Sequence, residues 1–96
     1  MKPSEALALH RTALRQLVSR HGLMNPRIFG SVLTGKDDEE SDLDLLVDAP
    51  PGPTLFRLGG LQIELESLLG IHVDLLTPGD LSPKFRARVL AEARPL

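Results

Sequence analysis

The sequence predicts an α/β (α+β) domain in which helices cover a small β-sheet. Short runs in which Leu, Val or Ile alternate with polar residues are typical of strands. Longer segments carry leucines at helical spacing and are typical of amphipathic helices. The predicted order is helix 4–21, strand 27–29, strand 42–48, helix 55–69, strand 71–76 and a last helix that begins after Ser82.

The length and the composition indicate a single domain over residues 1–96. Ordinary domains have roughly 100–200 residues, and hydrophobic residues make up 42% of this chain, which is enough to drive folding. The core must be aliphatic, because the chain has three Phe and neither Trp nor Tyr. The proline-rich segment 50–53 resembles a linker, but too little chain lies on either side of it for two independent cores.

Several classes of protein are excluded by residue content. The chain has no Cys, so disulfides and thiolate metal sites are ruled out. No apolar run approaches the roughly 18 residues of a membrane span, and charges interrupt the N-terminus where a signal peptide needs an apolar stretch. We therefore expect a cytoplasmic protein with no membrane contact. A net charge of −2 and few stacking aromatics also argue against nucleic acid as a partner.

Local signals set the expected ends of the elements. Ser4 can cap the first helix, and Asn25-Pro26 is expected to form a turn. A short helix over 31–34 is expected after the first strand.

The second long helix contains the pair Gly59-Gly60, which weakens a helix by about 1 kcal/mol per glycine. Close packing against a neighbour is one reason for such a pair. The last helix is expected to begin at Ser82-Pro83. Its apolar side is expected to consist of Leu81, Phe85 and Val89.

Two aspartates stand out in the second strand. Asp42 and Asp44 are two residues apart, so they share a face with Cα atoms about 6–7 Å apart. Leu43, Leu45 and Val47 are expected on the opposite face. Aspartate is depleted in strands, so this pair indicates either a sheet face open to water or two carboxylates that converge on a divalent cation.

A third aspartate favours the cation site. Asp74 lies in the apolar strand 71–76, and if that strand is next to 42–48, three carboxylates meet on one face. Carboxylates together with nucleotide phosphates suit Mg²⁺. Two such ions about 3.5–4 Å apart can activate an attacking oxygen and stabilise a leaving one.

The pair Gly30-Ser31 ends the first strand and opens the short helix 31–34. Backbone N–H groups and a hydroxyl at a helix N-terminus favour phosphate. A lone Gly-Ser pair is usually only a turn. Gly-Ser followed after ten residues by Asp-x-Asp in an apolar strand is far more specific.

The stretch from Phe29 to Asp48 resembles the signature of the polymerase-β-like nucleotidyltransferase superfamily. The whole chain resembles the minimal (MNT) branch of that superfamily, including the segments 70–78 and 81–83. The resemblance implies a mixed β-sheet flanked by helices, which is the nucleotidyltransferase fold.

The resemblance also implies the roles of five site residues. Asp42, Asp44 and Asp74 are implied as catalytic ligands of Mg²⁺ in a two-ion site, and Asp74 also helps to activate the acceptor hydroxyl. Gly30 and Ser31 are implied to hold the triphosphate tail of ATP, the expected substrate.

A partner protein is implied as well. MNT proteins are typically encoded beside HEPN-domain ribonuclease toxins and serve as their antitoxins, and members of the group transfer AMP from ATP to a tyrosine of the HEPN partner. We therefore expect a Mg²⁺-dependent protein adenylyltransferase. Relatives often carry Arg soon after Gly-Ser, whereas this chain has Val32-Leu33-Thr34. This difference leaves open the alternative of an antitoxin that neutralises its toxin by binding alone.

The remaining polar residues are not assigned to the metal or phosphate site. His72 is expected on the same face as Asp74, where a structural role is favoured over substrate contact. The acidic segment 37–40 is expected to be a solvated loop. The basic residues Lys84, Arg86 and Arg88 are expected either to face solvent or to bind the acceptor.

Overall fold

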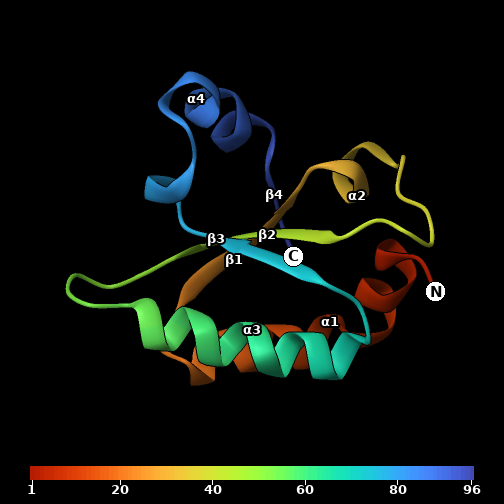
Figure 1. Ribbon diagram of the computed structural model, residues 1–96, viewed down its shortest axis with the longest axis horizontal. Helices are drawn as coiled ribbons and strands as arrows, with labels where there is room; N and C mark the ends of the chain where they lie inside the picture. The colour runs from red at the N-terminus through yellow and green to blue at the C-terminus, as the bar shows by residue number, and fades with distance from the viewer.

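The fold is built on a four-stranded mixed sheet with the strand order β3-β2-β1-β4 (Figure 1). The computed structural model describes all 96 residues. Strand β2 is parallel to β3, whereas β1 is antiparallel to both β2 and β4. The strands are β1 (Met24–Phe29), β2 (Leu43–Asp48), β3 (Val73–Leu76) and β4 (Arg94–Pro95).

Helices lie on both faces of this sheet. The two long helices α1 and α3 cover one face, and α2 and α4 lie on the other (Figure 1). None of the helices combines the length and the apolar composition needed to cross a bilayer. The helices are α1 (Pro3–Arg20), α2 (Ser31–Thr34), α3 (Leu55–Leu69) and α4 (Pro83–Glu92), and a 3₁₀ turn, η1 (Pro78–Asp80), follows β3.

The core lies between the sheet and the helices α1 and α3. Alternate residues of β2 point into it, because side chains along a strand alternate between the two faces. The predicted alternation is therefore confirmed, and it leaves Asp44 on the opposite face. Leu46 shares that opposite face and is also fully buried. The buried cluster includes Leu14 and Val18 of α1, Leu43, Leu45 and Val47 of β2, Leu61 and Leu65 of α3, and Val73 and Leu75 of β3.

The contact between α1 and α3 explains one of the two glycines in α3. A Cβ atom on Gly60 would lie 3.2 Å from Cε1 of His21, the residue directly after α1. Close packing as a reason for glycine is thus confirmed at Gly60. No neighbour lies within 4 Å of a Cβ placed on Gly59, so close packing does not explain that residue.

Four expectations about local structure were wrong. Asn25 and Pro26 lie inside β1, because a register shift between Met24 and Arg27 accommodates them as a bulge and Asn25 takes a φ of 53°. Strand β3 begins only at Val73. Ser4 is not the helix cap: Lys2 is, and its backbone N–H donates to Glu5 at 2.8 Å.

The fourth correction concerns α4. Of its expected apolar side, only Leu81, which precedes the helix, is buried; no residue of α4 itself is buried, and Phe85 is 50% exposed. The chain then ends in β4, which pairs with β1 through Arg27 and Ile28. The helix thus ends at Glu92, and Arg94 belongs to this short edge strand.

Candidate active site

Strand pairing brings the three predicted aspartates to one face of the sheet. Asp44 of β2 is the register partner of Asp74 on the parallel strand β3. Asp42 directly precedes β2, and His72 directly precedes β3. The N–H of Leu43 donates to the carbonyl of His72 at 3.0 Å, which fixes the two strand starts beside each other. Because Leu43 and Val73 point into the core, the residues on either side of them point away from it.

Three of these side chains can reach a single ion. One oxygen each of Asp42 and Asp74 and one ring nitrogen of His72 all lie within 4.8 Å of one another. Carboxylate oxygens suit hard divalent cations, and imidazole suits first-row transition ions. The donor set therefore fits a divalent metal, and Asp44, the register partner of Asp74, is available as a further carboxylate.

The electrostatics of Asp44 point the same way. Burial, then the hydrogen bond and the charge of Asp74, and then the charge of Asp42, raise the pKa of Asp44 to about 6. His72 opposes this effect only in part. Carboxylates crowded so closely are stabilised in their charged form when a cation lies between them. A strongly shifted carboxyl group is also typical of a functional site.

Gly30 joins the predicted phosphate site to the aspartates. It directly follows β1, whose last residue, Phe29, is the register partner of Asp44. A Cβ atom at position 30 would overlap the Asp44 carboxylate, and the φ of Gly30 is 74°, which favours glycine. Ser31 is the first residue of α2. The two parts of the signature, ten residues apart in sequence, are thus in direct contact.

His72 takes a larger part in the site than the sequence suggested. Its Nε2 lies 3.1 Å from Oδ1 of Asp74, and its Nδ1 lies 2.7 Å from Oε2 of Glu66 on α3. Desolvation lowers the pKa of His72, but the hydrogen bond to Asp74 and the charges of Asp42, Asp74 and Glu66 outweigh this and raise it. The signal in the sequence was the two-residue spacing from Asp74. Only the fold could show Glu66 on the other side of the ring.

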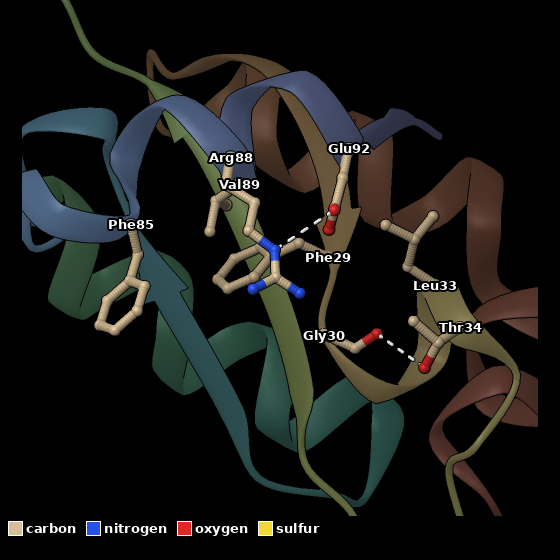
Figure 2. A pocket seen from close by; sticks show the side chains of 8 residues that line it. All are labelled: Phe29, Gly30, Leu33, Thr34, Phe85, Arg88, Val89 and Glu92. Carbon is tan, nitrogen blue, oxygen red and sulfur yellow. Dashed lines mark hydrogen bonds and ion pairs between the residues drawn. The ribbon is translucent and has the colours of Figure 1, made fainter.

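A pocket of about 260 Å³ adjoins Gly30 (Figure 2). Its cation is Arg88, whose side chain extends from α4 toward the segment that contains Phe29 and Gly30. The Nε atom of Arg88 lies 3.4 Å from Glu92, its neighbour one helical turn away. The pocket is lined by Phe29, Gly30, Leu33 and Thr34 on one side and by Phe85, Arg88, Val89 and Glu92 of α4 on the other.

A mixed sheet with clustered carboxylates on two parallel strands, beside a Gly-Ser turn, defines a candidate phosphoryl-group transferase. Residues 8–96 match the family model of the nucleotidyltransferase domain. The chain therefore belongs to the nucleotidyltransferase domain family, as the sequence predicted, and the expected fold class is confirmed.

Relatives of this chain carry more specific names. Protein adenylyltransferase MntA of Thermococcus cleftensis is 37% identical over 86 residues, which span 90% of this chain and 84% of that protein. A candidate protein adenylyltransferase of Methanocaldococcus jannaschii is 39% identical over 77 residues, which span 80% and 83% of the two chains.

Solved structures agree with the fold. A structure described as a candidate minimal nucleotidyltransferase superposes with a TM-score of 0.85 and 45% identity, and the match covers 97% of this chain and 95% of the other. The toxin–antitoxin MntA-HepT superposes with a TM-score of 0.67 over 92% of this chain and 69% of the other. Its identity of 21% supports the fold alone.

Proposed function

We propose that this nucleotidyltransferase is a Mg²⁺-dependent protein adenylyltransferase that moves AMP from ATP onto a tyrosine hydroxyl of a HEPN-type toxin and so acts as its antitoxin. The observation that carries the proposal is the pairing of Asp44 with Asp74 on neighbouring parallel strands, with Asp42 and Gly30 beside them. The names of the relatives support the reaction. With ATP as the proposed donor, we also propose that the reaction takes place in the cytoplasm and that residues 1–96 form the single domain that carries it out.

The residues have distinct roles in the proposed reaction. Asp42, Asp44 and Asp74 would hold Mg²⁺, which when bound polarises the phosphate oxygens and offsets their charge. Because Gly30 has no side chain, the Asp44 carboxylate can lie against the backbone at the start of α2. Ser31, the next residue, can donate its hydroxyl and N–H to the triphosphate tail.

The transfer itself is a displacement at phosphorus. The acceptor oxygen forms a bond to the α-phosphorus of ATP, and the bond from that phosphorus to the bridging oxygen of the β-phosphate breaks. Pyrophosphate leaves with the bonding electron pair, and the hydroxyl proton passes to the carboxylate of Asp74. The face that carries these groups also carries Asp42 and His72, so the acceptor must approach from the same side.

Arg88 is proposed to supply the cation that Val32-Leu33-Thr34 lack. A nucleoside triphosphate beside three carboxylates needs positive charge in addition to the metal, and Arg can bind phosphate oxygens with two parallel N–H groups. Arg88 is the one cationic side chain that lines the pocket next to Gly30. Its partner Glu92 is exposed, so exchanging that ion pair for a phosphate costs little.

Two solved structures of similar fold support the proposed partner and substrate. One structure is a toxin–antitoxin with AMP-PNP and another is the toxin–antitoxin MntA-HepT. A partner protein would also supply contact area that a chain of 96 residues lacks. The basic surface of α4 is the proposed contact for that partner.

Labelling with ATP tests this function. The protein is incubated with Mg²⁺, ATP labelled at the α-phosphate, and the toxin encoded beside it. We expect label on the toxin and a gain in mass equal to whole AMP units, and we expect neither with Asp42→Asn. Label only on added RNA would contradict the proposal. A tight complex that silences the toxin without any label would identify the binding-only antitoxin instead.

A further inference from the structure

The ring of His72 lies between two carboxylates that come from different elements. Oε2 of Glu66, on α3, is 2.7 Å from Nδ1, and Oδ1 of Asp74, on β3, is 3.1 Å from Nε2. The same Glu66 oxygen accepts the backbone N–H of Val73 at 2.9 Å. Glu66 is therefore held in place by the strand that carries Asp74, and the ring orientation of His72 is fixed through it.

This arrangement is the one found around metal-binding histidines. A histidine that ligates a metal commonly donates its other ring N–H to a carboxylate, which sets the tautomer and the ring orientation. If Nδ1–H donates to Glu66, the lone pair of the neutral ring is on Nε2. Nε2 lies 3.1 Å from Oδ1 of Asp74, and one ring nitrogen of His72 lies within 4.8 Å of a carboxylate oxygen of Asp42 as well.

The spacing of the donor atoms also suits an ion. Two ligand atoms, each about 2.1 Å from the same ion and at right angles, are about 3 Å apart. The separation between Nε2 of His72 and Oδ1 of Asp74 is 3.1 Å. An ion can therefore replace the shared proton of this pair with little movement of either side chain. The side chain of His72 is 53% exposed, so the position is open to an incoming ion.

We propose that His72 is itself a metal ligand, through Nε2, and that the site consequently prefers Mn²⁺ to Mg²⁺. The inference rests on the proposed function for the existence of the metal site, and it adds a nitrogen donor to the aspartates. Mg²⁺ prefers oxygen ligands and keeps its waters. Imidazole instead favours first-row transition ions over Mg²⁺. Glu66 is a positioning residue in this arrangement, because it acts through the ring of His72.

Metal binding without nucleotide tests the proposal. Mn²⁺ and Mg²⁺ are each titrated by calorimetry at about pH 8, where a free imidazole is neutral. We expect wild type to bind Mn²⁺ at least about tenfold more tightly than Mg²⁺. His72→Asn should lose about tenfold or more in Mn²⁺ affinity and much less in Mg²⁺ affinity. His10→Asn removes an imidazole from α1, away from the site, and should change neither affinity.

Pulsed electron paramagnetic resonance of bound Mn²⁺ gives a second readout. A directly bound imidazole transfers spin density to its nitrogen, so we expect ¹⁴N coupling in wild type and in His10→Asn. The coupling should disappear in His72→Asn, whose thermal unfolding should stay close to wild type because the side chain is half exposed.

The measurements distinguish a failure of this inference from a failure of the proposed function. An equal loss of both affinities in His72→Asn, or the absence of ¹⁴N coupling in wild type, would overturn the inference and leave the proposed carboxylate site in place. Binding of neither ion by wild type, with or without ATP, would overturn the inference and the proposed function together.

Discussion

Gly30 and Asp44 fit against each other so closely that position 30 has no room for a side chain. The Asp44 carboxylate fills the space that a Cβ on Gly30 would occupy, and the φ of Gly30 is 74°. Gly35, at the other end of α2, has almost the same φ of 73° but no atom within 4 Å of such a Cβ. The two glycines therefore separate the cost of backbone conformation from the cost of contact with the site.

Gly30→Ala should destabilise the protein more than Gly35→Ala. An alanine at positive φ costs about 1 kcal/mol at either position. At position 30 the overlap with Asp44 should add a further 1–3 kcal/mol or so, or displace the carboxylate. Urea unfolding measures both values. The excess should shrink when Asp44→Ala is combined with Gly30→Ala, and an equal cost at the two glycines would show that the contact does not matter.

Asp44→Asn should stabilise the metal-free protein in a pH-dependent way. Folding raises the pKa of Asp44 from 3.8 to about 6, so the folded state favours the protonated acid. Below about pH 4 the group is protonated in both states, and wild type should match the variant. As the pH rises through about 6 the folded state must hold a charged Asp44, and wild type loses stability relative to Asn.

The size of that effect is limited by solvent. The difference between a pKa of 3.8 and one of about 6 corresponds to about 3 kcal/mol for a fully desolvated group, and the partial exposure of Asp44 reduces our expectation to about 1 kcal/mol. Thermal unfolding in EDTA at several pH values measures it, and transfer activity should be lost at every pH. A variant that unfolds well below wild type at pH 7 would make Asp44 a structural residue.

Binding of ATP should require a divalent cation. The carboxylates of Asp42, Asp44 and Asp74 repel a triphosphate unless a cation lies between them. Calorimetric titration with ATP should show binding in Mg²⁺ and a loss of about tenfold or more in EDTA. Equal affinity under the two conditions would rule out the proposed arrangement. Asp42→Asn should bind ATP less tightly in Mg²⁺ and differ little from wild type in EDTA.

Arg88→Ala should raise the KM for ATP about tenfold with a smaller effect on kcat, because the contact to the triphosphate is formed before the transition state. Arg88→Lys should restore part of the affinity, since it keeps the charge and loses the paired N–H groups. Arg20→Ala makes the same change of charge on α1, across the sheet, and should leave the KM unchanged. If the KM for ATP in all three variants equals that of wild type, Arg88 does not contact the triphosphate.

The sequence was sufficient for those parts of the site that depend on local alternation. Asp42 and Asp44 could be assigned to one face because Leu43 and Leu45 needed the other. The position of Asp74 beside them followed once strand 71–76 was taken as a neighbour. These predictions depend on the alternation of apolar and polar residues along a strand. When one face of a sheet is buried, this alternation determines which face each side chain occupies.

The parts that depend on contacts between distant segments could not be read in this way. Asn25-Pro26 has the composition of a turn, yet pairing of β1 with β2 absorbs both residues as a bulge. The Glu66–His72 contact joins α3 to β3, and no local pattern specifies it. The spacing of apolar residues in α4 correctly predicted a helix, but it could not predict how exposed that helix is. Helical periodicity does not indicate how much of a helix surface a neighbouring element covers.

Because no residue of α4 is buried, this helix is a weakly anchored wall of the pocket next to Gly30. Local opening of an element is cheap when it buries few side chains, so the amide hydrogens of α4 should exchange with solvent faster than those of α1 and α3. A bound nucleotide that bridges Gly30 and Arg88 would tie α4 to the sheet and slow that exchange. The nucleotide and the acceptor protein would then both contact α4. A nucleotide in the pocket would hold the basic face of this helix in one orientation, and a partner would meet that fixed face.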